Sequence, residues 1–192
     1  MGRPRADAPG PKAQERIVDA FWTLLSEADY SSMSMAGLVK RADVNHNTFY
    51  RYHKSLDSLA VALAADSAAH GMAFYVVPAF CGPEASYGER GKIGGQDAEK
   101  ALLVAESGSR PLVDAMCSAA IRLWAGGEGG GASELDEGDI DRLTAVFWGV
   151  AAMAGGIPRS SLVERAESFR TSAMGEAAKE TLVEIAGKCS VA

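Results

Sequence analysis

The chain has 192 residues, of which 47% are hydrophobic and 23% charged, so it can bury a core and is not a disordered chain. The net charge of −6 argues against a protein that coats nucleic acid through its overall charge. Three cysteines without a Cys-x-x-Cys pair argue against a disulfide framework or zinc knuckle and favour thiols in a reducing cytoplasm. With no run of ~18 apolar residues and no secretory signal, we expect a cytoplasmic protein without a membrane partner.

The N-terminal third is predicted to be helical, because its apolar residues recur three and four positions apart. Residues 1–10, rich in Pro, Gly and Arg, are expected to form a flexible arm. A helix over 12–28 follows. Three further helices are each preceded by a polar residue that can cap the first turn. They cover 35–43 after Ser34, 46–52 after Asn45, and 56–69 after Ser55.

The pattern is weaker after residue 70, where Pro78 interrupts an apolar segment and residues 82–96 are predicted to form a loop. The Gly-rich segment 126–133 is expected to be a mobile linker, since no Gly-Lys-Ser/Thr follows as in a phosphate-binding loop. Further helices are predicted over 96–106, 110–124, 139–154 and 161–186, the last opened by a capping box of Ser161 and Glu164. No segment alternates like a strand, so the expected fold is all-α with about nine helices.

The second and third predicted helices have the lengths and the spacing of a known DNA-binding motif. They are short and are joined by the three-residue link 43–45, as in a helix-turn-helix, whose second helix lies in the major groove of DNA. Val44 is expected to be the buried residue of the turn. Residues 40–54 hold four basic residues against one acidic residue, so positive charge gathers here although the whole chain is acidic.

Several residues in this region have the order and spacing that are typical of one protein family. They are Tyr30, Ser34-Met35, Ala42-Asp43-Val44-Asn45, Thr48-Phe49-Tyr50-Arg51-Tyr52-His53 and Leu59. With them, residues 17–59 resemble the DNA-binding domain of the TetR family of bacterial transcriptional regulators. The sequence departs from the family at Asp29 and Asp43, which replace glycines, at His53, which replaces Phe, and at Leu56, which replaces Lys. The resemblance implies a helix-turn-helix domain at 11–57 and a ligand-binding and dimerisation domain at 58–192.

The resemblance implies that the protein is a homodimeric repressor. We expect it to bind a palindromic double-stranded DNA operator and to be released from it by a small-molecule effector. Residues at the start of the third helix are predicted to meet bases, since Asn can pair with adenine and Thr can contact a thymine methyl. These are Asn45, His46, Asn47 and Thr48. Predicted phosphate contacts are Tyr50, Arg51, Tyr52 and Lys54. Two alternatives stay open: Asn45 acts only as a cap, and Tyr52 belongs only to the core.

The C-terminal part is expected to dimerise through the helices over 139–154 and 161–186, where Gly149 permits close approach. Residues 58–125 would enclose the effector cavity. Its candidate lining residues are Phe74, Tyr75, Met116 and Trp124, each of which could equally be ordinary packing.

Two other classes of protein remain possible. One is an interaction protein that keeps the fold but has lost operator binding, which Asp43 and Leu56 would favour. The other is an all-α enzyme, but no Ser-His-Asp set, GxSxG or paired carboxylate motif is visible, so no enzyme is expected. The three histidines do not have the spacing of metal ligands, and no cofactor is expected.

Overall fold

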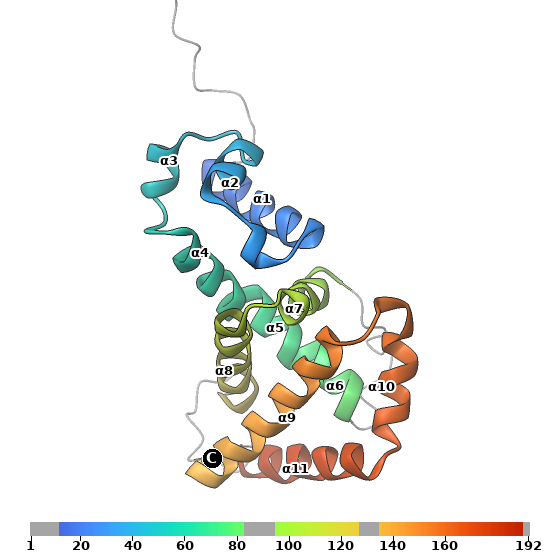
Figure 1. The fold of residues 1–192 in the computed structure, drawn as a ribbon. Helices are drawn as coiled ribbons and strands as arrows, with labels where there is room; N and C mark the ends of the chain where they lie inside the picture. Colours follow the sequence, from blue (N-terminus) through green and yellow to red (C-terminus); the bar gives the residue numbers. More distant parts are fainter. Residues whose placement is uncertain (1–11, 83–94, 127–134, 190–192) are drawn as a thin grey trace, which may run out of the picture.

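The computed structural model describes residues 12–82, 95–126 and 135–189, and within these ranges it is all helical (Figure 1). The expected arm at 1–10 and nearly all of the expected loop at 82–96 and linker at 126–133 lie outside the described residues. The helices are α1 Ala13–Glu27, α2 Met35–Arg41, α3 His46–Tyr50, α4 Leu56–Leu63, α5 Ala69–Gly71, α6 Val77–Cys81, α7 Gln96–Glu106, α8 Arg110–Gly126, α9 Glu137–Gly155, α10 Leu162–Arg170 and α11 Ala173–Cys189. Because α4 to α6 form one continuous helix, the described residues contain nine separate helices, and the all-α prediction is confirmed.

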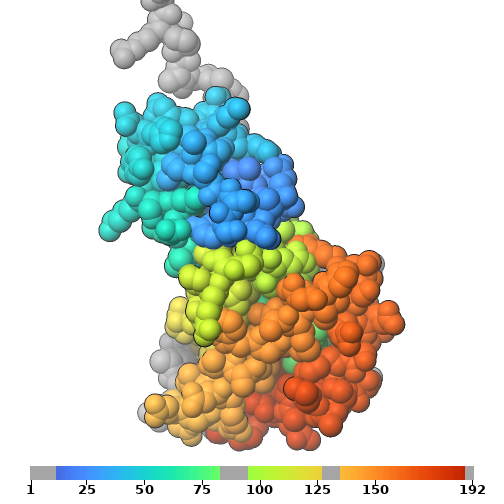
Figure 2. Space-filling view, viewed as in Figure 1, coloured from blue at the N-terminus to red at the C-terminus, as the bar shows by residue number. Residues whose placement is uncertain are grey.

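The head of the molecule, which we define as α1 to α4, forms one end of it (Figures 1 and 2). Its apolar residues are buried where α1, α2, α3 and α4 meet: Ile17, Phe21, Leu38, Phe49 and Leu59 are all fully buried. The short 3-10 helix Tyr30–Ser32 connects α1 to α2. The third helix is shorter than predicted, because it ends at Tyr50 rather than at residue 52.

A single helix from Leu56 to Cys81 connects the head to the rest of the chain, where the sequence predicts a weak, interrupted segment. Two wider π-helical segments, Ala64–Ala68 and Met72–Val76, lie within it. The second segment directly precedes α6, which contains Pro78 in its first turn. A local π-helical adjustment lets a helix continue past a residue that lacks an N–H, so Pro78 does not end the helix.

By length and composition alone, this helix could also cross a membrane, with a mean hydropathy of 1.4 over its most apolar 18-residue window. Half of that window is buried inside the fold, as in the core helix of a soluble protein.

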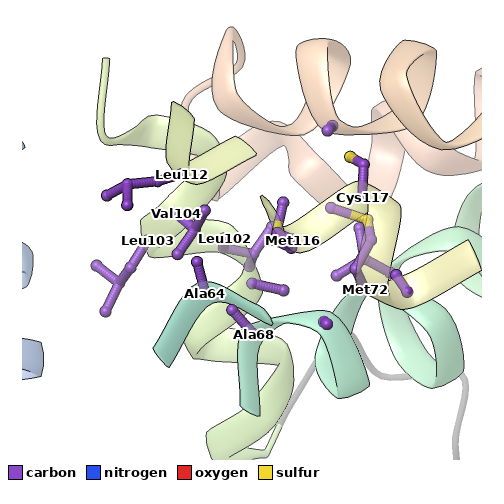
Figure 3. Packing of buried hydrophobic residues seen from close by; sticks show 14 of the residues in the cluster. Ala64, Ala68, Met72, Leu102, Leu103, Val104, Leu112, Met116 and Cys117 are labelled. Atoms are coloured by element: carbon purple, nitrogen blue, oxygen red, sulfur yellow. The ribbon is translucent and has the colours of Figure 1, made fainter. Parts of the chain in front are cut away.

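We call the part beyond the head, residues 64–189, the body. Its centre is a closely packed core rich in small residues. Ala64 and Ala68 of the long helix face Leu102 to Val104 of α7, and Met72 lies near Met116 and Cys117 of α8 (Figure 3). At Gly71, an added Cβ would lie 1.8 Å from the carbonyl oxygen of Asp97. The long helix and α7 therefore approach each other backbone to backbone, which only glycine permits here.

The C-terminal region differs from the sequence prediction of one helix over 161–186. It forms two helices, α10 and α11, which meet at a corner at Thr171 and Ser172 (Figure 1). The Ser172 hydroxyl accepts the Gly175 N–H at 3.1 Å, which caps the start of α11. The predicted capping box is also wrong, because the Ser161 side chain makes no cap hydrogen bond.

Candidate DNA-binding interface

The link between α2 and α3 is a tight turn whose shape depends on Asp43. This residue has φ = +50°, a left-handed conformation that Asp tolerates better than most residues. The Val44 N–H donates to the Val39 carbonyl at 3.0 Å, and Val44 is partly buried against the core. Arg16 of α1 donates from Nη2 to the Asp43 carbonyl at 3.3 Å. These contacts hold α2 and α3 in the arrangement of a helix-turn-helix.

The short helices of the head begin at the three caps predicted from the sequence. Each cap side-chain oxygen accepts the backbone N–H three residues later. The pairs are Ser34 with Gly37 at 3.1 Å, Asn45 with Thr48 at 2.7 Å, and Ser55 with Ser58 at 3.0 Å. The amide oxygen of Asn45 is therefore engaged in the cap, and its predicted base contact stays a prediction.

The third helix has one buried side and one exposed side. Phe49 is fully buried and holds the helix against the head core. His46, Asn47 and Arg51 are exposed on the other side, and Tyr50 is 56% exposed. Tyr52, just beyond the helix, is 44% exposed, so the alternative that it belongs only to the core is wrong. A contiguous exposed polar surface over α3 is the arrangement that groove binding requires.

The positive charge of this surface is distributed differently from the sequence expectation. Arg41 forms two hydrogen bonds to Glu27, at 2.8 and 2.6 Å, which raises the pKa of Arg41 and lowers that of Glu27. Within the described residues, Lys40, Arg51 and Lys54 form no ion pair. These three cations, rather than Arg41, are therefore available for phosphate contacts.

His53 lies directly after the tyrosines and packs against Phe49, with ring centroids 5.5 Å apart. Its Nε2 is buried without a hydrogen-bond partner among the described residues. Burial lowers the pKa of His53, which favours a neutral ring at pH 7. His53, which is half-buried, therefore packs as a largely apolar ring beside Phe49, in the place where the resemblance has Phe.

For three residues that position this interface, the sequence does not reveal the contacts: Arg16, which binds the turn, and the pair of Tyr30 and Asp57. The Tyr30 hydroxyl donates to Asp57 Oδ1 at 2.5 Å, in the first turn of α4. Twenty-seven residues separate the partners in each of these contacts. Periodicity cannot reveal such pairs, because it reports only neighbours three and four positions apart.

The candidate effector contacts lie in different surroundings. Phe74 is 40% exposed and packs near His70, with ring centroids 4.8 Å apart, while Tyr75 is half-buried. Met116 is fully buried in the core, and Trp124 packs partly buried against it. These four residues do not line one cavity among those found in the described residues, and their effector role stays a prediction.

An apolar groove of about 430 Å³ lies instead between α9 and α11. Val146, Gly149 and Met153 of α9 face it, together with Met174 and Ala178 of α11. An added Cβ at Gly149 would meet no atom within 4 Å, so this part of α9 borders open space. The groove lies on the two regions that the sequence predicts for dimerisation.

The start of α9 and the end of α11 are connected by ion pairs around one buried carboxylate. Asp139 accepts hydrogen bonds from Lys188 Nζ at 2.8 and 2.9 Å and from Arg142 at 2.5 Å. Arg142 also binds Glu184 of α11. These contacts hold the pKa of Asp139 below its usual value and fix one end of the groove. In the described ranges, no three His, Cys, Asp or Glu side chains could together hold a metal ion.

The head is that of a helix-turn-helix DNA-binding protein, as its capped helices, left-handed turn and exposed third helix establish. Residues 17–63 match the family model described as bacterial regulatory proteins, tetR family. Residues 17–63 therefore form a DNA-binding domain of the TetR type, as the sequence resemblance predicts. No curated protein and no solved structure matches the chain.

Proposed function

We propose that the chain is a homodimeric transcriptional repressor that binds a palindromic operator in the cytoplasm, is released by a small-molecule effector, and carries out no catalysis. The observation that supports DNA binding most directly is the exposed face of α3 with buried Phe49 behind it. A helix held in this way can enter the major groove without rearranging the head.

Within this interface, Asn47 and Arg51 are assigned different roles. Asn47 is exposed at the start of α3, and its side chain forms no hydrogen bond within the described residues, so its amide is available to a base. Arg51 is exposed at the C-cap of α3 and without an ion pair there, which suits a phosphate contact. Phosphate contacts strengthen binding to every sequence, whereas base contacts distinguish sequences.

The test is selection of bound duplexes from a genomic fragment library, followed by titration of the selected duplex at several salt concentrations. Arg51→Ala should weaken binding to all duplexes and reduce the salt slope by about 1. Asn47→Ala should cost about 1–3 kcal/mol on the selected duplex and relax preference at one position. Selection of no duplex by the wild-type protein would instead favour the interaction-protein alternative, which the neutralised Arg41 and the acidic Asp43 support.

Dimerisation is assigned to the α9–α11 groove. Met174 on its wall is 74% exposed, and Val146, Val150 and Met153 of α9 add further apolar side chains to the lining. Apolar surface of this kind on adjacent helices is typical of a protein–protein interface. A two-fold dimer places two copies of α3 so that they can bind half-sites about 34–36 Å apart or further along DNA.

Gly149→Arg tests this assignment, because the substitution fits the open space of the subunit but places a charge in the interface. Sedimentation equilibrium should show a dimer for the wild type and a monomer for Gly149→Arg, with weakened binding to the selected duplex. Gly187→Arg on α11 is the matched control, since a Cβ there also meets no atom within 4 Å. A dimeric Gly149→Arg protein would contradict the assignment.

The effector role rests on linkage. A ligand that prefers one arrangement of the body shifts the population of head arrangements only if its affinities for the two differ. Phe74, Tyr75, Met116 and Trp124 remain the proposed contacts, since all four lie on the long helix or α8, next to the core that connects body and head. A compound bound there should lower affinity for the selected duplex.

A further inference from the structure

One residue outside α3, the recognition helix, forms hydrogen bonds with two segments that lie far from it in the chain. Tyr30 begins the 3-10 helix between α1 and α2. Its hydroxyl donates to Asp57 Oδ1, in the first turn of α4, at 2.5 Å. Its backbone N–H donates to the carbonyl of Ser107, between α7 and α8, at 3.2 Å. Tyr30 thus connects the helix that follows the recognition helix with a corner of the body.

The contact with Asp57 is of a strong type. A hydroxyl that donates to a carboxylate forms a short, charge-assisted hydrogen bond, which is about twice as strong as a neutral one. Burial of the ring and the neighbouring carboxylate raise the pKa of Tyr30 well above its usual value, so the hydroxyl keeps the proton that it donates. The hydrogen bond to Asp57 therefore fixes the Tyr30 ring relative to α4.

The body side of the connection is also rigid. Ser107 is 3% exposed, and its hydroxyl donates to the Val104 carbonyl at 2.7 Å and accepts the Ser109 N–H at 3.2 Å. Gly108, in the left-handed region at φ = +67°, completes the corner. A displacement of the corner between α7 and α8 is therefore transferred to the backbone of Tyr30.

A second contact between head and body has a different geometry. Lys100 Nζ of α7 lies over the Trp22 ring of α1, 5.7 Å from its centroid. Such a contact is less directional than a hydrogen bond and does not involve α4. The hydrogen bonds of Tyr30, by contrast, connect the corner between α7 and α8 to the first turn of α4, in addition to the direct packing of α4 against α8.

We propose that Tyr30 is a positioning residue for DNA recognition, which couples the corner between α7 and α8 to the recognition helix through its two hydrogen bonds. The inference rests on the proposed function and adds a route for its regulation. Coupling between two sites is reciprocal. If a change at the α7–α8 corner alters the position of α3, then DNA bound at α3 must also alter the α7–α8 corner.

The experiment measures this reciprocal effect, which requires no effector. Hydrogen exchange of the amides in residues 105–112 is compared with and without the duplex selected by the wild-type protein. DNA should slow exchange there at least about threefold in the wild type. Tyr30→Phe keeps the ring but lacks the hydroxyl, and should lose this response while still binding the duplex. Asp57→Ala removes the acceptor from the other side and should lose it as well.

The matched control is Ser32→Ala, which removes a hydrogen bond from the Ser32 hydroxyl to the Asp29 carbonyl within the same short segment and leaves both Tyr30 bonds in place. It should keep the wild-type response. An unchanged response in Tyr30→Phe or in Asp57→Ala, or no response in the wild type, would overturn the inference. If Tyr30→Phe does not fold, Asp57→Ala decides alone. Failure to select any duplex is a separate outcome, which counts against the proposed function.

Discussion

The head and the body of this protein are stabilised in different ways. In the head, short helices begin at side-chain caps, and hydrogen bonds such as that from Arg16 to the Asp43 carbonyl connect separate elements. In the body, small residues bring backbones together, as at Gly71, and an open apolar groove remains at the surface. The head is thus defined largely by directional contacts, and the body by the fit of packed surfaces.

The largest expected effect on stability is at Phe49, a head residue that acts through packing rather than through a directional contact. Phe49→Ala should reduce the free energy of unfolding by about 3–5 kcal/mol, because it leaves a cavity at a fully buried position. Urea titration measures the change. Tyr50→Ala, at the neighbouring exposed ring, should change stability by less than about 0.5 kcal/mol. Equal costs for the two variants would show that the head does not depend on this ring.

A smaller effect is expected where the body is most closely packed. Gly71→Ala should cost about 1–3 kcal/mol, because the new methyl group overlaps the backbone of Asp97 and neither segment can move freely. Gly187→Ala, where a Cβ meets nothing within 4 Å, should instead leave stability unchanged or raise it by up to about 1 kcal/mol. Thermal unfolding of both variants gives the comparison. A neutral Gly71→Ala would contradict the close approach of the helices.

The smallest effect depends on pH and concerns a directional contact within the body. The pKa of Asp139 is lowered in the folded state by hydrogen bonds from Lys188 and Arg142, so its contribution to stability is present above the unfolded pKa of about 3.9. This contribution is lost as the pH falls below that value. Asp139→Asn should lower the melting temperature at pH 7, and the difference should shrink by pH 3.5.

The exposed Asp141→Asn is the control for this series and should show no comparable difference at either pH. A difference between wild type and Asp139→Asn that stays constant with pH would show that the charge of Asp139 is not what stabilises the contact.

Much of the head could be predicted from the sequence because its signals are local. The capping oxygens of Ser34, Asn45 and Ser55 act on amides three residues away, and the left-handed residue Asp43 stands directly between two helices. The pairing of Arg41 with Glu27 could not be predicted in this way, because the fold alone brings these two side chains together.

The body was predicted less completely for the same reason. The boundaries 96–106 match α7, whose apolar periodicity is regular. Pro78 suggested an interruption that a π-helical segment removes, and the corner at Ser172 depends on a cap that periodicity does not show. The groove between α9 and α11 combines residues from distant segments and cannot be outlined before the helices are placed.

The unbroken helix from Leu56 to Cys81 gives the molecule a mechanical property. Its 26 residues span about 39 Å, at about 1.5 Å per residue. A tilt of about 5° around one end moves the other end by about 3 Å, close to the roughly 3.4 Å step between neighbouring base pairs. A rod of this length thus converts a small angular change deep in the body into a misfit of about one base-pair step at the DNA.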